Sequence, residues 1–473
     1  MKKVAVLYDD RRIPDREIKS ITGNRSFGQT IYKRVSLKDR MIKKLGSFKN
    51  VSEIYVADEE NGDIRDVLKS GTKEDTALFR IFSDFLIEDS DEISVLLQKA
   101  CYIKEIYRVM QGERVVCIMY PCIPDLLNED EASVNTYEKI EGKGFIDLSD
   151  VNNFRQFITS GFDARFFNSL KGDRYTVVKH SSNRDKLRAE YRYYGFLPEQ
   201  MRMWYALPFD YKEDENGASY SMERFFVADV ALRYVHGAMD TAEFKMLLDK
   251  LFYFIKNRKS KEYPLEYCKG SAKRLYVDKV LQRLSDLKAM DGFEKLETFI
   301  KTGTGYSSID EIKDRYLRLY EKLESRRHYD ACLYAAHGDL CFSNILYNSD
   351  MDLLKLIDPK GAETEDELYM DPYYDVCKLS HSVLGEYDYF NSDLFEITLN
   401  DDLRFRLVID DGGNERFKDI FKEYLHSYDM DYDLVRIYEA SLFLSMLPLH
   451  MDREKKVFGF ILNALRIMDE LEE

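Results

Sequence analysis

The most informative stretch of the sequence is HGDLCFSNILYNSDMDLLKLIDPKG, residues 337–361. It contains Asp339, then Asn344 after four intervening residues, and then Asp358 after a turn and an apolar run, LLKLI. Phosphoryl transfer needs a carboxylate that orients the attacking hydroxyl and accepts its proton, and it needs oxygen ligands for the Mg²⁺ that binds the triphosphate. The acid, the amide and the second acid at this spacing therefore predict a site for Mg²⁺-dependent phosphoryl transfer.

The same segment belongs to a longer pattern, in which HGD begins at His337 and DPYYD follows at 371–375. A lone His-Gly-Asp tripeptide is commonly a solvated turn, but these parts in this order favour the functional interpretation. The pattern resembles the signature of the aminoglycoside phosphotransferase and choline kinase-like family, which is related to the protein kinases. By this resemblance Asp339 is the catalytic base, Asn344 and Asp358 bind Mg²⁺, and His337 and Asp375 brace the loop by hydrogen bonds.

Two parts of the protein-kinase pattern are missing. Asp358-Pro359-Lys360-Gly361 stands where a protein kinase has Asp-Phe-Gly, and no Ala-Pro-Glu segment follows. Activity on proteins is therefore disfavoured. Lys360 is either an additional phosphate contact or, like most lysines, a charge on the surface.

A second set of residues, upstream of the HGD loop, predicts the lobe that binds the nucleotide. YTVVKH, residues 175–180, reads as a strand that contains Lys179, and a helix with a capping pattern follows and carries Glu190. In kinases a strand lysine reaches the α- and β-phosphates and a helix glutamate holds it. Each residue alone would more often be a solvated charge, but their position ahead of the loop favours this role.

Other candidate contacts to ATP rest on weaker patterns. FITSGFDARFF, residues 157–167, contains a single glycine, Gly161, whose backbone is a candidate phosphate contact. ASYSMERFFVAD, residues 218–229, places Met222 and Glu223 before a polar break, where such kinases hold adenine by backbone hydrogen bonds. An ordinary strand end is the alternative interpretation of this segment.

The first 125 residues alternate short apolar runs with helical patterns, which predicts an α/β domain with a parallel sheet. They resemble sugar-phosphate nucleotidyltransferases in SLKDRMIKKLGSFKNVSEIYVAD and in Asp84, a candidate metal-binding acid at the end of ALFRIF. However, DDRR occupies residues 9–12, where that family has a glycine loop that cradles a triphosphate. This departure favours a degenerate domain, and the alternative to a metal-binding role for Asp84 is that this residue simply ends a strand.

The predicted fold class is a two-domain chain, with an N-terminal α/β, nucleotidyltransferase-like parallel sheet and a C-terminal α+β, bilobal kinase-like fold. The length of 473 residues is too great for one core. The predicted parts are the N-terminal domain at 1–125, an acidic linker at 126–145, a kinase-like N-lobe at 146–228, and a helical C-lobe with the catalytic loop at 229–473.

Composition limits the partners. A formal net charge of -16 disfavours a nucleic-acid-binding surface. No apolar run approaches the roughly 18 residues of a membrane span, so no membrane insertion is expected. The seven cysteines lack zinc-ligand spacing, which indicates reduced thiols and a cytoplasmic protein. The expected partners are ATP, Mg²⁺ and a small-molecule acceptor, while the sequence leaves open the oligomeric state and the choice between ATP and GTP.

The predicted function is an ATP- and Mg²⁺-dependent phosphotransferase for a hydroxyl of a sugar or amino alcohol, by analogy in the synthesis of precursors for bacterial capsule or surface polysaccharide. One alternative is an aminoglycoside-type antibiotic phosphotransferase, whose acidic pocket could come from the charged loop at 363–367. Others are a bifunctional kinase and nucleotidyltransferase, and a non-catalytic nucleotide-binding scaffold. The presence of Asp339, Asn344 and Asp358 together disfavours the scaffold.

Overall fold

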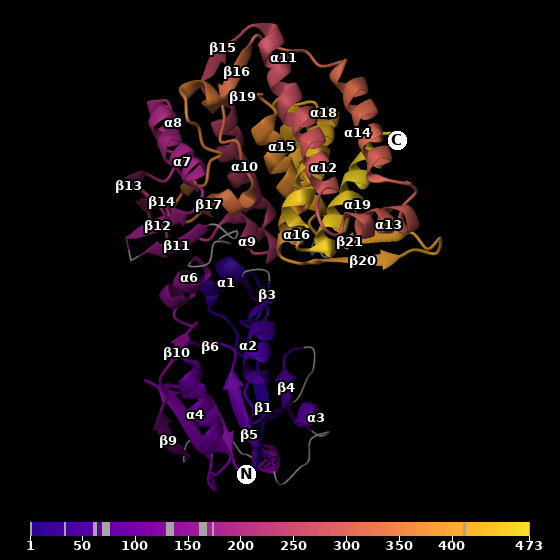
Figure 1. Ribbon diagram of the computed structural model, residues 1–473. Coiled ribbons are helices and arrows are strands. Elements are labelled where there is room, and N and C mark those ends of the chain that lie inside the picture. The colour runs from indigo at the N-terminus through magenta and orange to yellow at the C-terminus, as the bar shows by residue number, and fades with distance from the viewer. Residues whose placement is uncertain are drawn as a thin grey trace. The chain divides into compact units, whose positions relative to one another are not determined.

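The computed structural model describes residues 2–32, 35–59, 64–68, 76–128, 137–159, 168–172, 175–409 and 413–472. The chain forms two compact units (Figure 1). Unit 1 comprises Met1–Gly161 together with His236–Ala238. Unit 2 comprises Phe162–Val235 and Met239–Glu473.

Unit 1 is built on a six-stranded mixed sheet with the order β4-β1-β5-β8-β7-β9. The strands are β4 (Val51–Ala57), β1 (Lys3–Asp9), β5 (Thr76–Phe82), β8 (Arg114–Tyr120), β7 (Tyr107–Gln111) and β9 (Glu138–Glu141). β1 runs parallel to β4 and β5. Its residues 4–8 are fully buried, as expected for a strand that is covered on both faces.

The predicted all-parallel sheet is wrong for the second half of this domain. β8 is antiparallel to both β5 and β7. The cause is local, because only Gly112 and Glu113 connect β7 to β8, and a connection this short permits only an antiparallel hairpin. Gly112 has a φ of 59°, a left-handed conformation that suits such a turn. EISVLLQKACYIKEIYRVM, residues 92–110, has the pattern of a single helix, but α4 (Ser90–Ala100) ends at Ala100.

Unit 1 also extends further along the chain than the predicted boundary at residue 125. β9 joins the main sheet, and β10 (Phe145–Asp147) pairs with β6 (Phe85–Ile87), so the described part of the predicted linker is folded into the unit. α6 (Val151–Thr159) follows, in residues expected to begin the second domain. The remaining elements are α1 (Arg16–Thr22), β2 (Ile31–Tyr32), β3 (Val35–Ser36), α2 (Leu37–Gly46), α3 (Ile64–Leu68) and α5 (Ile123–Leu127).

Unit 2 begins with a four-stranded antiparallel sheet with the order β11-β12-β14-β13. Its strands are β11 (Asn168–Gly172), β12 (Thr176–Ser181), β14 (Gly217–Glu223) and β13 (Pro208–Asp214). Helix α7 (Arg184–Phe196) packs on this sheet, and its Leu187 contacts Ala218 and Tyr220. Asn183 caps the helix through its side chain, which accepts a hydrogen bond from the backbone of Lys186.

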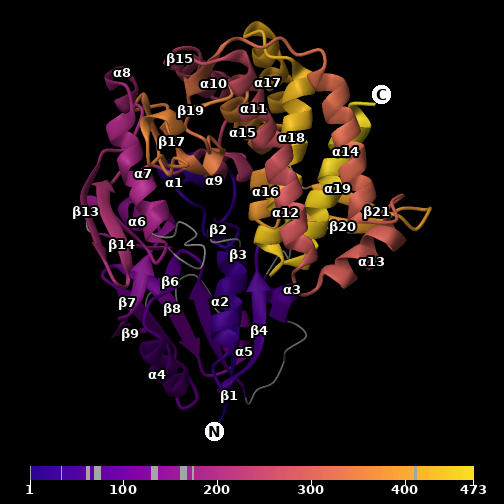
Figure 2. The same cartoon turned by 45° about the horizontal axis from the view of Figure 1, so that its top comes forward.

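The rest of unit 2 is mainly helical and shares one large apolar core. Helix α18 (Tyr432–Met446) lies at its centre and contacts α12, α14, α15 and α19 (Figures 1 and 2). The helices are α8 (Glu199–Arg202), α9 (Val230–Val235), α10 (Thr241–Lys256), α11 (Leu265–Lys273), α12 (Lys279–Lys288), α13 (Phe293–Gly303), α14 (Ile309–Glu324), α15 (Tyr374–Val383), α16 (Tyr387–Asn391), α17 (Glu415–Ser427) and α19 (Glu454–Glu470).

Three short β structures interrupt these helices. A hairpin of β17 (Ile345–Asn348) and β18 (Leu353–Leu356) carries the segment from which the sequence analysis began. The others are a sheet of β15 (Ser260–Glu262), β16 (Cys332–Ala335) and β19 (Tyr369–Met370), and a hairpin of β20 (Phe395–Leu399) and β21 (Phe405–Ile409). Within the described part of the chain, no helix combines the length and the apolar character needed to cross a membrane.

Candidate active site

The β17–β18 hairpin brings Asn344 and Asp358 to the same end of one small structure. Ile345, the first residue of β17, lies opposite Leu356, the last residue of β18. One step further, the backbone N–H of Ile357 donates to the carbonyl oxygen of Asn344 at 3.0 Å. Because an antiparallel hairpin aligns its two ends, a separation in sequence becomes proximity in space. Asn344 precedes the hairpin and Asp358 follows it.

Asn344 also contacts Asp339. Its Nδ2 donates to the backbone oxygen of Asp339 at 2.8 Å and to the Oδ2 of Asp339 at 3.2 Å. Because the NH₂ group is held in this way, Oδ1 is the atom of Asn344 that is left to act as a ligand. The carboxylate of Asp339 meets Lys378, whose Nζ lies 2.9 Å from Oδ1. The three predicted residues of the loop thus lie together, with a lysine that was not predicted.

The oxygens that these residues present suit Mg²⁺. Asp358 has a left-handed backbone with a φ of 54°, and its half-exposed carboxylate uses Oδ1 to accept from Lys179. Asp358 Oδ2 and Asn344 Oδ1 are then hard oxygen ligands, and Mg²⁺ is typically held by few protein ligands together with phosphates and water. Among the described residues, no group of three or more His, Cys, Asp and Glu side chains could hold a metal ion. A dedicated protein cage of such ligands is therefore not present in that part of the chain.

Lys179, on β12, links the sheet to the loop. Its Nζ lies 2.6 Å from Glu190 Oε2, on α7, and 2.8 Å from Asp358 Oδ1. Lys179 and Glu190 are each only 4% exposed, so neither is the solvated charge that it could have been from the sequence alone. Burial would lower the pKa of Lys179, but the charges of Asp358 and Glu190 raise it well above its ordinary value. The lysine is therefore fully charged at neutral pH.

His337 and Asp375 hold the backbone of the loop. The carboxylate of Asp375 accepts from the N–H of His337 at 3.0 Å and from the N–H of Gly338 at 2.8 Å, and Arg258 donates to it at 2.9 Å. The Nε2 of His337 donates to the carbonyl oxygen of Ile357 at 3.0 Å, and its Nδ1 accepts from the N–H of Asp339 at 3.2 Å. These roles require the neutral ring, which agrees with burial lowering the pKa of His337.

Arg258 and Lys378 are the functional candidates that the sequence analysis missed. Arg258 is 5% exposed and comes from the turn after α10, far from the loop in sequence, where no motif marks it. Lys378 follows Asp375 by three positions on α15, and this helical spacing places both residues on one face. That spacing was the available signal, but a helix lysine usually indicates a solvated surface.

The three weaker candidates for ATP contact have different outcomes. Gly161 lies outside the described residues. Met222 and Glu223 end β14, where the N–H of Glu223 donates to Leu207 at 3.2 Å and is therefore already used by the protein. Met222 packs on an apolar cluster of Ala206, Val227, Leu346 and Ile357, which Phe225 and Leu353 also border. Ile357 is the neighbour of Asp358, so this cluster adjoins the loop.

In unit 1 the candidate acid Asp84 is 1% exposed and is paired with two arginines. The Nη1 of Arg12 lies 2.9 Å from both of its carboxylate oxygens, and Arg114 also binds it. Asp9 is paired in the same way with Arg11 and Arg80. The DDRR segment stands where sugar-phosphate nucleotidyltransferases have a glycine loop. In this structure it instead forms ion pairs at the ends of β1 and β5.

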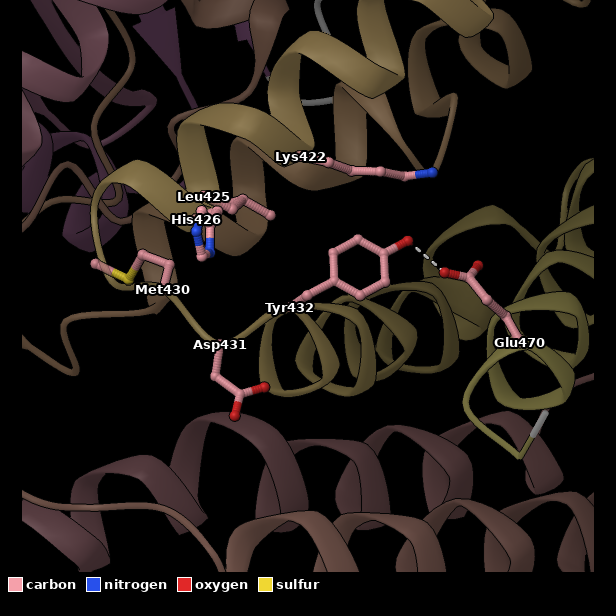
Figure 3. Close-up of a pocket in the computed structure, with 7 residues that line it drawn as sticks. All are labelled: Lys422, Leu425, His426, Met430, Asp431, Tyr432 and Glu470. Atoms are coloured by element: carbon pink, nitrogen blue, oxygen red, sulfur yellow. Dashed lines mark hydrogen bonds between the residues drawn. The ribbon is translucent and has the colours of Figure 1, made fainter.

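A separate hollow of about 540 Å³ lies in unit 2 between α17, the start of α18 and the end of α19. Figure 3 shows its lining, in which Tyr432 donates a hydrogen bond to Glu470. The other lining residues are Lys422, Leu425, His426, Met430 and Asp431. None of them is among the predicted site residues, so the chemistry of the loop does not depend on this hollow.

The antiparallel sheet with Lys179, the helix with Glu190 and the loop that carries Asp339, Asn344 and Asp358 give unit 2 a kinase-like fold, as the sequence predicted. No family model matches the chain, and no curated protein matches it. The solved structures to which it is similar include aminoglycoside phosphotransferases, the family that the signature residues resembled.

Three of these structures illustrate the comparison. The phosphotransferase APH(3'')-Id from Streptomyces rimosus shares 16% identity over 63% of this chain and 98% of its own, with a TM-score of 0.35. It was also solved in complex with ADP and streptomycin. A thermostable mutant of APH(4)-Ia shares 10% identity over 64% of this chain and 94% of its own, with a TM-score of 0.37. A protein described as a fructosamine-3-kinase from Haemophilus somnus shares 12% identity over 63% of this chain and 84% of its own, with a TM-score of 0.38.

Proposed function

We propose that unit 2 is an ATP- and Mg²⁺-dependent phosphotransferase that acts on a hydroxyl of a small molecule. One observation carries the proposal. Lys179 binds Glu190 on one side and Asp358 on the other, although Asp358 comes from a loop that is far from the other two residues in sequence. A lysine held between a helix glutamate and a loop aspartate is the arrangement by which kinases position nucleotide phosphates.

The nucleotide would lie between the sheet and the loop. Lys179 would contact the α- and β-phosphates, and Asn344 and Asp358 would hold Mg²⁺, which would neutralise charge on the phosphates. The apolar cluster of Ala206, Val227, Leu346 and Ile357 would pack against the adenine ring. Met222 and Glu223 would border the ring as the end of the hinge strand, and the backbone of Gly161 is proposed to cover the phosphates.

Asp339 would orient the acceptor hydroxyl and take its proton. The hydroxyl oxygen attacks the γ-phosphorus, the bond from that phosphorus to the β,γ-bridging oxygen breaks, and the proton passes to a carboxylate oxygen of Asp339. The products are a phosphate ester and ADP. His337 and Asp375 would keep the loop in place for this step, because together they bind its backbone at three N–H groups.

The proposed setting is the cytoplasm, where ATP is abundant and where the seven cysteines, all unpaired in this structure, would stay reduced. We retain a sugar or amino alcohol as the acceptor and bacterial surface-polysaccharide precursors as the pathway, on the analogy of kinase-like domains that occur beside nucleotidyltransferase-like ones. The closed ion pairs of Asp84 favour a single activity for the chain over a bifunctional enzyme.

The proposal is tested by acceptor-dependent ADP release. Purified protein is incubated with Mg-ATP and a panel of sugars, polyols, amino alcohols and aminoglycosides, and ADP is measured with a coupled assay. We expect at least one acceptor to stimulate ADP release, and chelation of Mg²⁺ to abolish it. Failure of the folded protein to bind Mg-ATP in calorimetry would contradict the proposal.

A further inference from the structure

Three lysines from three separate elements surround one tyrosine beside Asp339. These residues, Lys279 at the start of α12, Lys360 in the loop after β18 and Lys378 on α15, are called the lysine cluster below. Tyr374, the first residue of α15, is 2% exposed and lies among them. Only Lys360 was considered from the sequence, where a lone lysine is most often a surface charge.

Each lysine is tied to the candidate site by a contact. The Nζ of Lys279 donates to the hydroxyl of Tyr374 at 3.2 Å. Lys378 comes one helical turn after Tyr374, and its Nζ lies 2.9 Å from Asp339 Oδ1. The backbone N–H of Lys360 donates to the carbonyl oxygen of His337 at 3.0 Å. The cluster therefore extends from Asp339 toward α12.

The position of Lys360 is further restricted by Gly338. Gly338 has a φ of 76°, and a Cβ added to it would lie 2.7 Å from the Cβ of Lys360. The stem of Lys360 is therefore pressed against the backbone next to Asp339. Its side chain is exposed, and its ammonium group forms no hydrogen bond or ion pair with any residue in the described part of the chain.

Asp339 forms an ion pair with the cluster and the charge of Glu367 also acts on Lys360, so two acids offset three positive charges. Asp339 is the only carboxylate among the described residues that forms an ion pair with any of the three ammonium groups. Burial alone would raise the pKa of Tyr374, but Lys279, Lys378 and Lys360 together lower it below its ordinary value. Like charges held close together destabilise a fold unless an anion joins them, and a phosphate supplies about two negative charges at neutral pH.

We infer that the acceptor carries a phosphate monoester close to the hydroxyl that is phosphorylated. This inference rests on the proposed function, because it assigns to Asp339 the acceptor hydroxyl. Lys378 touches Asp339 directly, so a phosphate bound by Lys378 and Lys279 would lie a few bonds from that hydroxyl. The product would carry a second phosphate ester, and its class is that of a sugar or polyol bisphosphate.

The proposed phosphate of the acceptor would bind mainly to other residues than the phosphates of ATP. The donor has its own proposed partners, which are Lys179 and the ligands Asn344 and Asp358. Lys360 and Lys378 are near enough to the loop to contact the transferred group as well. Lys279 forms no hydrogen bond or ion pair with the described residues of the loop and reaches the site through Tyr374, so its substitution should affect mainly the acceptor.

Two of the acids at 363–367 that could have formed a pocket for a polycation are engaged elsewhere. Glu363 pairs with Arg188 and Arg192 of α7, and Asp366 pairs with Lys261. A cationic acceptor such as an aminoglycoside would meet the lysine cluster and be repelled. An anionic acceptor therefore fits the site better than the antibiotic alternative.

The first test uses inorganic phosphate as the probe. The full-length protein is saturated with Mg²⁺ and a non-hydrolysable ATP analogue, so that the donor site is filled, and phosphate is then titrated calorimetrically. We expect phosphate to bind the wild-type protein and to bind Lys279→Met at least tenfold more weakly. The matched control is Lys288→Met, which removes the same charge from the exposed end of the same helix and should not change binding.

Three results of this titration would overturn the inference: no phosphate binding by the wild-type protein, equal binding by Lys279→Met, or binding that disappears when the ATP analogue is present. The last result would show that the cluster holds the donor phosphate. In all three cases the wild-type protein would still bind Mg-ATP. Failure of the wild-type protein to bind Mg-ATP would instead overturn the proposed function itself.

The second test compares acceptors in pairs that differ only by a phosphate, such as glycerol 3-phosphate with glycerol and glucose 6-phosphate with glucose. We expect the phosphorylated member to stimulate ADP release more strongly in each pair that is used. For that acceptor, Lys279→Met should raise KM at least tenfold while KM for Mg-ATP stays within twofold. A preference for the neutral member would overturn the inference and leave the phosphotransferase proposal standing.

Discussion

Asp339 and Asp358 are two carboxylates of one loop, but their neighbours differ. Asp339 contacts Lys378 and the amide of Asn344. Asp358 binds Lys179 and comes directly after the hairpin that positions Asn344. These neighbours suit the proposed roles, in which the first carboxylate serves the acceptor and the second serves the nucleotide and its metal.

The two carboxylates should consequently fail in different ways when each becomes an amide. In Asp339→Asn the hydroxyl loses its proton acceptor while the metal ligands remain, so kcat should fall about 100-fold or more with Mg-ATP affinity within a few-fold of normal. In Asp358→Asn a hard anionic ligand becomes neutral, so kcat and Mg-ATP affinity should fall together. Calorimetric titration of Mg-ATP into both folded variants measures this, and equal loss of binding in the two would contradict the assignment.

Substitution of Lys179 should reduce turnover and stability more than substitution of Glu190. Lys179→Met removes the phosphate contact and leaves the buried Glu190 without its main partner, so we expect loss of turnover and a lower melting temperature. Glu190→Gln keeps the shape and a hydrogen-bond acceptor for Lys179, so turnover should fall less and stability should change little. Steady-state kinetics with thermal unfolding compares the two. Normal rates in both variants would contradict the proposal that the nucleotide binds beside Lys179 and Glu190.

At the residue scale, the sequence predicted the positions that short-range spacing controls. Asp339, Asn344 and Asp358 could be found because one hairpin connects them, and hairpin geometry follows from local sequence. Arg258 could not, because the turn after α10 reaches the loop only through the packing of the whole unit, and the spacing of Lys378 from Asp375 was too weak a signal against a surface lysine. The lysine cluster was missed for the same reason as Arg258, since Lys279 and Tyr374 are distant in sequence.

At the element scale, α7 is held against the loop by a close backbone approach. Gly361 has a φ of 90°, and a Cβ at this position would lie 2.9 Å from backbone atoms of Ala189 and Glu190. Next to it, the N–H of Ala362 donates to the carbonyl oxygen of Ala189 at 3.0 Å. The glycine after Asp358-Pro359-Lys360 therefore sets how near α7, and with it Glu190, comes to the loop.

Gly361→Ala should move α7 away from the loop. We expect the melting temperature to fall, with a loss of about 1–3 kcal/mol from overpacking and the left-handed backbone, and Mg-ATP affinity to fall with it. The control is Gly195→Ala on the same helix, where a Cβ meets nothing within 4 Å and where alanine is neutral or stabilising. Thermal unfolding and nucleotide titration of both variants test the role of this contact, and equal behaviour would refute it.

Some helices and strands could be predicted from the sequence and others could not, for physical reasons. Strand β12 and helix α7 were found because β-branched residues and a capping pattern mark them locally. β7 was hidden, because IYRVM at 106–110 continues a helical pattern and only the turn at Gly112 ends it. Sheet direction in unit 1 depended on that turn, so one missed hairpin changed the predicted topology.

At the scale of the whole molecule, each unit has its own apolar core and its own buried charges. Val6, Phe79 and Met119 are fully buried in unit 1, and Val435, Tyr438 and Phe443 are fully buried in unit 2. The boundary could not be read from composition, because the acidic stretch at 125–135 precedes a strand, β9, that still belongs to the first sheet. The strand β9 is short and polar, and only its partner β7 identifies it as part of that sheet.

The two units should respond separately when the ion pairs of unit 1 are broken. Asp84→Asn leaves the half-buried guanidinium group of Arg12 without its counter-charge and leaves Arg114 with Asp147 alone, which should destabilise unit 1 by about 2 kcal/mol. Because the proposed phosphoryl transfer uses residues of unit 2, acceptor-dependent ADP release below the unfolding temperature should stay within twofold of normal. The control is Asp91→Asn, an exposed acid of the same unit, which should change neither property by much. Calorimetric unfolding and kinetics on the three proteins decide the matter, since loss of phosphoryl transfer in a folded Asp84→Asn protein would show that both units form one site.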